Sequence, residues 1–335
     1  MGVDIILVAL IAIVPTVFYV LFVRWLDRYE REPPALLAAA FLWGAVPAVI
    51  GSLIIEIIVG VPLNRLFSGL LSEITQSSAI APVVEETVKA VGLLALLFFF
   101  RGEFDDALDG VIYGALVGFG FAMTENFFYF LGTLDQSGLR GVGELALLRI
   151  GLFGTTHAFF TGVTGAGLGY ARSTANRRRG RVVAVFSFGM AIAFHALHNL
   201  GASIASRELA GVTIALLNIV TGLLLLCVIV VWALAQERRW IANELREEIG
   251  VSITPGEYEL LTRKRSLLVK KAGPLACVAG RRTYLLAELA RLATELAFKK
   301  HQARAGARED QQAILQLRSQ LAALRRAAAD LRPTA

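Results

Sequence analysis

The sequence contains little cysteine, which argues against two classes of structural site. Of its 335 residues only 2 are cysteines, Cys227 within an apolar run and Cys277 near the C-terminal end. No C-x-x-C spacing occurs, so the pattern supports neither a disulfide framework nor a thiolate metal site. An H-E-x-x-H motif and any recognised nucleic-acid reader are also missing. The chemistry of the chain must therefore be sought among other residues.

Charged residues are scarce over the first two thirds of the chain, where long apolar runs replace them. Hydrophobic residues make up 56% of the sequence, against about 45–50% in soluble domains. Seven runs approach or exceed the length of about 20 residues that a helix needs to cross a bilayer. They cover residues 2–23, 35–60, 78–100, 107–131, 145–171, 182–205 and 210–234. The alternating pattern of a membrane barrel is absent, so the sequence predicts an all-α, polytopic membrane helix bundle.

The orientation of the bundle follows from Lys and Arg in the loops, which favour the cytoplasmic side. The loops on one side contain Arg24, Arg28, Arg31, Arg101, Arg172, Arg177, Arg178, Arg179, Arg181, Arg238 and Arg239. The other side has only Arg65, Arg140 and Arg207, with Arg149 near the start of the fifth run. The first run lacks a basic n-region and a cleavage site, so we expect a retained helix. The pattern places the N-terminus outside and the C-terminus in the cytoplasm.

Residues 235–335 differ from the rest in charge and in hydrophobic pattern. They contain 19 Lys/Arg and 11 Asp/Glu, a net charge of +8, whereas residues 1–234 contain 14 and 16, a net charge of −2. Leucines recur at helical spacing in two stretches: Leu285, Leu286, Leu289 and Leu292, then Leu315, Leu317, Leu321 and Leu324. We expect a membrane domain over 1–234 and a basic cytoplasmic helical tail over 235–335. Its helices would pack on each other, on a partner or on anionic lipid, but not on nucleic acid.

Ionisable and polar side chains lie inside the predicted spans, where Asp, Lys or Arg at a helix centre costs about 2.5–3.5 kcal/mol. They are Glu85, Glu86, Lys89, Glu125, Asn126, His157, His195, His198 and Asn199. At 1.5 Å per residue, Glu85 lies roughly 11 Å and Glu125 roughly 9 Å from the outer face. His157 and His195 fall between the midplane and the outer half. Four helices therefore bring acids and imidazoles to one layer of the membrane.

Spacing along the helices predicts which of these side chains are neighbours. Lys89 follows Glu85 by four residues and Glu86 by three, so it can neutralise one of the two acids. Adjacent glutamates project about 100° apart, which indicates different roles for the two. His195 and Asn199 share a helix face. Glycines that permit close helix approach surround Glu125 and His157: Gly114, Gly118, Gly120, Gly162, Gly165, Gly167 and Gly169.

Taken in order, these motifs resemble the PrsW family of intramembrane proteases, which is related to the CAAX prenyl-protein endopeptidases. The motifs are Glu85-Glu86-x-x-Lys89, Phe121-x-x-x-Glu125-Asn126, the run from His157 to Gly162, His195-x-x-x-Asn199 and the loop from Asp27 to Pro34. The resemblance covers about residues 20–205 and leaves out the tail. It implies peptide-bond hydrolysis by water in the bacterial cytoplasmic membrane. The implied substrate is a single-pass membrane protein cut near its extracytoplasmic side, such as an anti-sigma factor.

The residue types fit such a hydrolysis. Two close carboxyls in low dielectric do not both ionise cheaply, so the charged one can activate water with help from an imidazole. The predicted catalytic residues are Glu85, Glu86, Glu125, His157, His195 and Asn199, the last two as oxyanion donors. Metal-free glutamate chemistry is slightly favoured because no H-E-x-x-H spacing is present. If zinc takes part, its predicted ligands are Glu86 (or Glu85), Glu125, His157 and His195.

Two other functions are compatible with buried polar residues. The first is a proton-coupled membrane transporter that uses a Glu/His relay, and the second is a scaffold in which the polar residues only join helices. A relay should connect one face of the membrane to the other, and transporters often carry inverted repeats. The clustered depth and the lack of a visible repeat count against the transporter. In a scaffold, Glu86→Gln or Glu125→Gln would change stability and leave function intact.

Overall fold

The computed structural model describes residues 2–27, 31–63, 69–205, 208–263, 280–304 and 310–329, and these are helical almost throughout. No β-strand occurs within these ranges, which contain one isolated bridge between Ile249 and Ile253. The prediction of an all-α fold is therefore confirmed. Residues 28–30 of the loop before the second helix, with Arg65, Arg207 and Cys277, lie outside the described residues.

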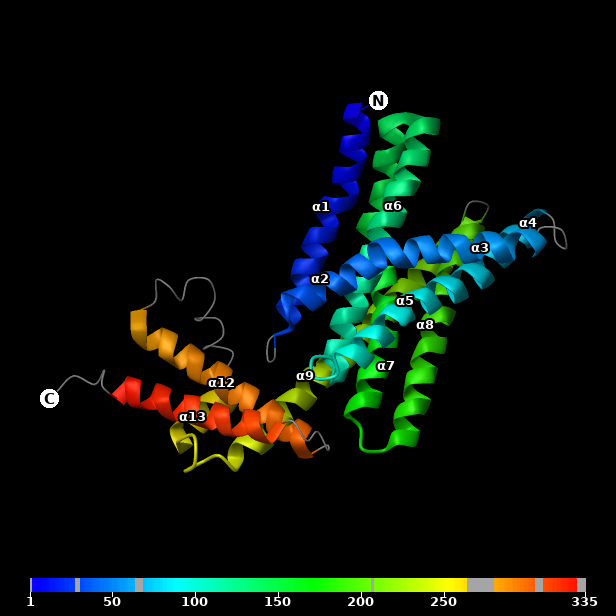
Figure 1. Ribbon diagram of the computed structural model, residues 1–335. Helices are drawn as coiled ribbons and strands as arrows, with labels where there is room; N and C mark the ends of the chain where they lie inside the picture. Colours follow the sequence, from blue (N-terminus) through cyan, green and yellow to red (C-terminus); the bar gives the residue numbers. More distant parts are fainter. Residues whose placement is uncertain are drawn as a thin grey trace. The chain divides into compact units, whose positions relative to one another are not determined.

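The chain forms two compact units, and the first covers Met1–Asp27 and Glu32–Val231. Its helices are α1 (Gly2–Leu26), α2 (Pro34–Trp43), α3 (Val49–Leu63), α4 (Gly69–Thr75), α5 (Ala81–Phe99), α6 (Ala107–Ala146), α7 (Thr156–Ser173), α8 (Arg177–Ala205) and the first part of α9 (Leu209–Arg246) (Figure 1). Short π-helical segments extend several of them: η1 (Gly44–Ala48), η2 (Gln76–Ile80) and η3 (Leu147–Leu152).

Within the described ranges, five stretches are long and apolar enough to cross a membrane. They are Gly2–Leu26, Pro34–Gly60, Ala107–Ser173, Arg177–Ala205 and Leu209–Arg246. The predicted fourth and fifth spans both fall within Ala107–Ser173. The predicted third span corresponds to η2 and α5. Helix α5 carries Glu85, Glu86 and Lys89, and this span is not among the five stretches. The count of seven spans stays a prediction.

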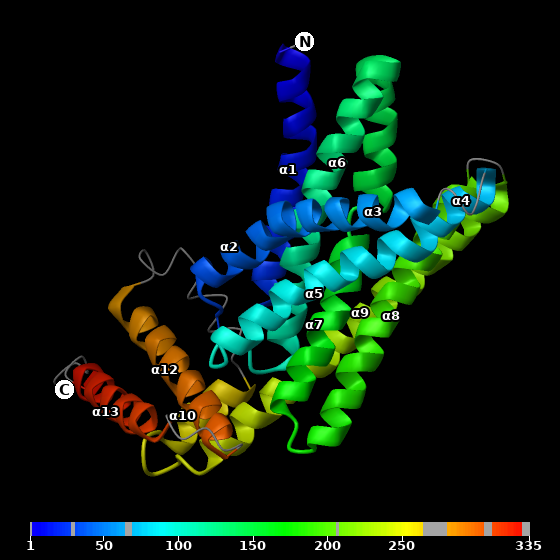
Figure 2. The same ribbon diagram turned by 45° about the vertical axis from the view of Figure 1, so that its right-hand side comes forward.

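Helix α6 consists of two limbs, whereas the sequence predicted a span that ends near residue 131. Gly138 has φ 66° and ψ −169°, a backbone conformation that residues with a side chain rarely adopt, and the chain reverses there (Figures 1 and 2). The second limb returns through η3, and α7 begins only at Thr156. The prediction of one continuous span over 145–171 is therefore wrong. The first part of this range belongs to the returning limb of α6 and to η3, and its apolar sequence resembles the start of a membrane span.

Helices α6 and α7 approach so closely that backbone meets backbone. A Cβ atom added to Gly118 would lie 2.3 Å from the carbonyl oxygen of His157, and one added to Gly114 would lie 2.4 Å from that of Thr161. Such contacts leave no room for a side chain, so the expected close approach is confirmed at these positions. Helix α8 runs back along α7 after a short turn (Figure 2). The backbone that carries His157 is thus packed directly on α6.

The second unit begins at Trp232 and comprises the end of α9 with α10 (Pro255–Arg263), α12 (Gly280–Arg304) and α13 (Asp310–Ala329). Its apolar core includes Ile241, Leu245, Leu289, Leu292, Leu317 and Leu321, with Leu324 packed against it. The tail helices therefore pack on each other, although Leu315 is 64% exposed and lies outside this core. The predicted boundary between a membrane domain over 1–234 and a tail over 235–335 stays a prediction.

An ionic contact joins three helices of the second unit. Glu248 Oε1 lies 2.7 Å from Lys300 Nζ and 2.7 Å from Arg318 Nη2. Burial alone would raise the pKa of Glu248, but hydrogen bonds from Arg318, Lys300 and Ser252 outweigh it and lower this pKa to about 2. The carboxylate is therefore charged at neutral pH and ties the end of α9 to α12 and α13.

In the first unit, the loop before α2 places Glu32 in a buried acidic cluster. The Tyr113 hydroxyl donates a hydrogen bond to the Glu32 carboxyl, and the Glu32 amide donates to Asp27 Oδ2 at 2.8 Å. Burial raises the pKa of Glu32 to about 8, and the charge of Asp27 adds to this, while hydrogen bonds with Asp109 and Tyr113 oppose it. Glu32 is therefore mostly protonated in the folded chain at neutral pH.

This raised pKa predicts a pH-dependent stability. Because the folded-state pKa of Glu32 lies above its unfolded value, its contribution is complete below about pH 4.5 and is lost as pH rises through about 8. The free energy of unfolding should fall by up to about 1.4 kcal/mol per pH unit in this window relative to Glu32→Gln. Denaturant unfolding in detergent from pH 5 to pH 8 measures the difference. Parallel curves for the two proteins would contradict the assignment, and Glu144→Gln, at an exposed ion pair, serves as the control.

Candidate active site

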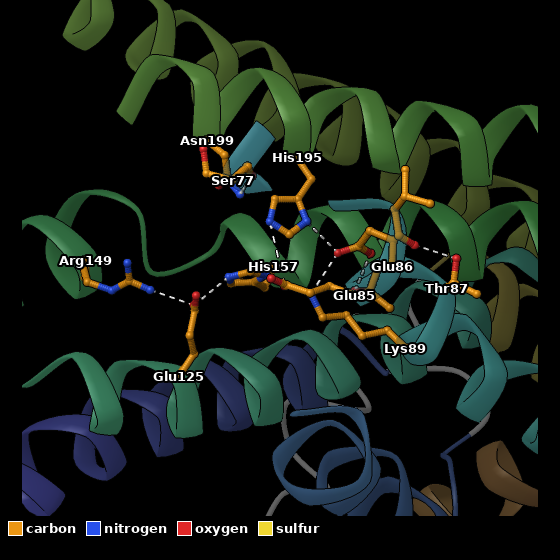
Figure 3. Close-up of polar contacts among 12 residues, drawn as sticks. Ser77, Glu85, Glu86, Thr87, Lys89, Glu125, Arg149, His157, His195 and Asn199 are labelled. Atoms are coloured by element: carbon orange, nitrogen blue, oxygen red, sulfur yellow. Dashed lines mark hydrogen bonds and ion pairs between the residues drawn. The ribbon is translucent and has the colours of Figure 1, made fainter. Parts of the chain in front are cut away.

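Helices α5, α6, α7 and α8 bring their polar side chains into one buried cluster (Figure 3). The exposed fraction is 0% for Lys89 and 1% each for Glu86 and His195, and Glu85 and His157 are also buried. Glu125 is partly buried at the edge of the cluster. The structure therefore brings together Glu85, Glu86, Glu125, His157 and His195, which the sequence places up to 110 residues apart.

The centre of the cluster is the ammonium group of Lys89. It lies 3.1 Å from Glu85 Oε2, 2.9 Å from Glu86 Oε1 and 3.0 Å from His157 Nδ1. A lysine ammonium has three N–H donors, so these three acceptors satisfy it completely. The ring of Phe121 lies 3.7 Å from the same nitrogen. Lys89 therefore bonds both acids, and its single positive charge balances one of their two negative charges.

The contacts of His157 define which of its nitrogens carries the proton. Nδ1 faces the Lys89 ammonium, which can only donate, so Nδ1 is an acceptor. Nε2 lies 3.0 Å from Glu125 Oε2 and donates to that carboxylate. The ring of His157 is thus held from behind by Glu125, with the lone pair of Nδ1 directed into the cluster.

His195 has the equivalent arrangement with Glu86. Its Nδ1 lies 3.0 Å from Glu86 Oε1, and its ring stacks on Phe160 with 4.8 Å between ring centroids. The second oxygen of Glu86 accepts from the Thr161 hydroxyl at 3.1 Å. Both oxygens of Glu86 are therefore engaged, whereas His195 Nε2 faces Glu85 Oε2 at 3.9 Å.

The cluster contains a set of side chains that could hold a metal ion. One ligand atom each from Glu85, His157 and His195 lies within 4.8 Å of the others, and all three residues are buried. A carboxylate with two imidazoles is a donor set that zinc uses in catalytic sites. In metal sites the far nitrogen of a ligating histidine commonly bonds a carboxylate, as both histidines do here. The residues therefore fit zinc, with Glu86 and Glu125 behind the histidines instead of in the predicted ligand set.

Two other polar residues of α8 lie apart from this arrangement. Asn199 donates through Nδ2 to the backbone oxygen of Ser77 at 2.8 Å, on the far side of His195 from Lys89 (Figure 3). His198 packs edge-on against Phe153, and its buried Nδ1 has no partner among the described residues. The predicted oxyanion role of Asn199 stays a prediction, and in this arrangement its amide group is already bonded.

Sequence reasoning used Arg149 only to judge topology, but the structure places it at the site. Its Nη2 lies 2.7 Å from Glu125 Oε2, and its Nε lies 2.6 Å from Asn126 Oδ1. One available signal pointed to it, since Arg149 lay inside the predicted span over 145–171. A charged residue within a span is a candidate functional group by default.

Comparison with known proteins identifies the family. A family model described as PrsW family intramembrane metalloprotease matches residues 32–235, a range that contains every residue of the cluster. The chain belongs to the PrsW family. PrsW membership and the five apolar helical stretches together indicate a multi-pass membrane protein. No solved structure matches the chain.

Curated relatives within the PrsW family support the assignment. Protease PrsW of Clostridioides difficile (strain 630) is 37% identical over 120 residues, which cover 36% of this chain and 49% of the relative. Protease PrsW of Geobacillus kaustophilus (strain HTA426) is 31% identical over 159 residues, or 46% and 61%. Protease PrsW of Bacillus subtilis (strain 168) is 30% identical over 156 residues, or 46% and 63%. The matched part spans less than two thirds of each relative.

The contacts of Lys89 predict a large loss of stability when its charge is removed. Lys89→Met would leave Glu85 and Glu86 buried without their shared cation, and breaking a buried ion pair on one side costs about 3–5 kcal/mol. Denaturant unfolding of metal-free protein in detergent measures this loss. Adding Glu86→Gln to Lys89→Met should restore part of it.

The matched control is Arg140→Met, which breaks an ion pair with Glu144 whose side chains are 91% and 67% exposed. Exposed pairs contribute about 0–1 kcal/mol. Equal losses for the Lys89 and Arg140 variants would contradict a special role for the buried ammonium.

Proposed function

We propose that the chain is an intramembrane endopeptidase that hydrolyses a membrane-embedded protein. The observation that carries this proposal is the pairing of two buried histidines with two glutamates, His157 with Glu125 and His195 with Glu86. The other imidazole nitrogens face the centre of the cluster, where His157 Nδ1 lies 3.0 Å from Lys89 Nζ and His195 Nε2 lies 3.9 Å from Glu85 Oε2. The arrangement is suited to holding and polarising a water molecule beside a carbonyl group.

The proposal includes a metal ion, in agreement with the description of the family. Glu85, His157 and His195 would hold zinc, which in such sites lowers the pKa of a bound water and polarises a carbonyl oxygen. This revises the slight preference for metal-free chemistry drawn from the sequence, because that preference was based only on a missing H-E-x-x-H motif. The required ligands come instead from three separate helices, α5, α7 and α8.

The two adjacent glutamates take different roles in this proposal. Glu85 has one hydrogen-bond donor within the described residues, Lys89, so its carboxyl has acceptor capacity left for water. Glu86 accepts from Lys89, His195 and Thr161 and therefore positions His195. Glu125 positions His157 in the same way. Lys89 supplies the positive charge that lets these carboxylates lie together in a buried site.

The substrate is proposed to be a single-pass membrane protein cut near its extracytoplasmic side, with an anti-sigma factor as one example. The distribution of arginines in the loops supports an outer N-terminus, a cytoplasmic tail and seven spans in the bacterial cell membrane. In that orientation Glu85 and Glu125 lie roughly 9–11 Å below the outer face, counted at 1.5 Å per residue. A peptide bond in the outer half of a substrate helix would reach this depth.

The first test replaces the carboxyl that remains available to water. Glu85→Gln should reduce proteolysis by at least about 10²–10⁴-fold, the usual contribution of a general base, whether this carboxyl holds zinc or activates water directly. Quantitative proteomics of membrane-protein fragments from cells that express either protein measures this, with Glu144→Gln as a surface control. If the same fragments are released by Glu85→Gln, or if proteoliposomes instead show Glu85-dependent proton flux, the protease proposal is wrong.

The second test concerns zinc. The purified full chain should contain about one zinc per molecule, and His157→Ala or His195→Ala should lose it, since three protein ligands usually hold catalytic zinc. Elemental analysis measures the content directly. His198→Ala is the matched control, because His198 lies one turn from His195 on α8 and has no carboxylate partner in the described chain. Zinc-free protein that cleaves at the full rate and resists chelators would restore the metal-free alternative.

A further inference from the structure

Arg149 is attached to the candidate site by three contacts on one face of α6. Its Nη2 and Nε lie 2.7 Å and 2.6 Å from Glu125 Oε2 and Asn126 Oδ1. Its guanidinium carbon lies 3.8 Å from the ring centroid of Tyr129, one turn further along the helix. Two directed hydrogen bonds and a stacked ring fix the planar guanidinium in one orientation.

The fold brings Arg149 to this position from far along the chain. Gly138 lies midway between Asn126 and Arg149, and its positive φ reverses the chain so that η3 returns beside the first limb of α6. Helix α1 holds η3 in place, because the Tyr19 hydroxyl donates to the backbone oxygen of Ile150 at 2.9 Å. The position of Arg149 is therefore set by the backbone on both sides of the hairpin.

One oxygen of Glu125 connects Arg149 to the histidine. Oε2 accepts from Arg149 at 2.7 Å and lies 3.0 Å from His157 Nε2. The Glu125 side chain is 23% exposed, so without Arg149 it has a path to rotate away from His157. The guanidinium always donates, because it does not lose its proton in proteins.

We propose that Arg149 is a positioning residue of the hydrolytic site. By holding Glu125 against His157 Nε2, it fixes the orientation of the imidazole ring, so that the lone pair of Nδ1 stays directed toward Lys89. This inference rests on the proposed function for its effect on proteolysis. The effect of Arg149 on the His157 ring does not depend on that function and can be tested separately.

The test uses nitrogen NMR of the full chain in nanodiscs, with ¹⁵N-labelled histidine and no added metal. The chain has 4 histidines, and the His157 signals are assigned by their loss in His157→Gln. The unchanged protein should show Nε2 protonated and Nδ1 unprotonated. In Arg149→Met the Nε2 signal should shift as its hydrogen bond to Glu125 is lost, while Lys89 keeps Nδ1 unprotonated. Arg149→Lys, which keeps the charge but lacks the fork that reaches both partners, should give an intermediate result.

Arg140→Met is the control, because Arg140 lies on the same returning limb in an exposed ion pair and touches no residue of the cluster. Zinc affinity and proteolysis should each fall about 10–100-fold in Arg149→Met, as for other outer-shell partners of metal ligands. Unchanged His157 signals in a folded Arg149→Met protein would overturn the proposal. If Arg149→Met does not fold, Arg149→Lys and Asn126→Ala provide the same comparison.

The two proposals can fail independently. A His157 Nε2 signal that shifts in Arg149→Met, in a chain that releases no membrane fragments, would refute the protease proposal while supporting the role of Arg149. Normal proteolysis with an unshifted Nε2 signal in Arg149→Met would refute the positioning role of Arg149 and leave the protease proposal in place.

Discussion

The candidate site depends on one buried ammonium group. Glu85 and Glu86 are neighbours in sequence and both are buried, so their negative charges would oppose folding in the absence of a cation. Lys89 is on the same helix, bonds both acids, and uses its third N–H on His157. Helix α5 therefore brings its own counter-charge to the helices around it. The other side chains of the site, including both histidines, are arranged around the Lys89 ammonium.

Two Glu–His pairs give the cluster its geometry. Each of these two glutamates lies behind an imidazole and leaves the opposite nitrogen facing the cluster, where His157 Nδ1 accepts from Lys89. Within the described residues Glu86 is bonded through both carboxylate oxygens, whereas Glu85 and Glu125 are each bonded through one. The close backbone contact of Gly118 with His157 keeps α7 at a fixed distance from α6, so only a rotation of the Glu125 side chain can separate the Glu125–His157 pair without moving a helix.

The sequence predicted the helical fold and the membership of this cluster, because buried acids and imidazoles are rare enough in apolar runs for their depths to be compared. The roles of individual residues could not be predicted in the same way. Whether Glu86 faces water or supports His195 depends on side-chain torsions that spacing does not determine. The displaced position of Asn199 depends on the π-helical segment η2, which brings the Ser77 carbonyl to it. The position of Arg149 was not predicted because the reversal at Gly138 lies in a polar stretch between two predicted spans, where a loop was expected.

The two Glu–His pairs are also nested along the chain. Glu86 and His195 are 109 residues apart, and the segment between them contains the other pair, Glu125 and His157, which are 32 residues apart. At about 5–20 residues per second, α5 is made roughly 5–20 s before the segment that completes its outer pair. During this interval Lys89 is the partner within reach, and it accompanies the acids into the bilayer on the same helix. The nascent polypeptide therefore has no complete reactive centre until α8 has been synthesised. If the chain is the protease proposed above, the order of synthesis itself protects neighbouring membrane proteins from an incomplete active site.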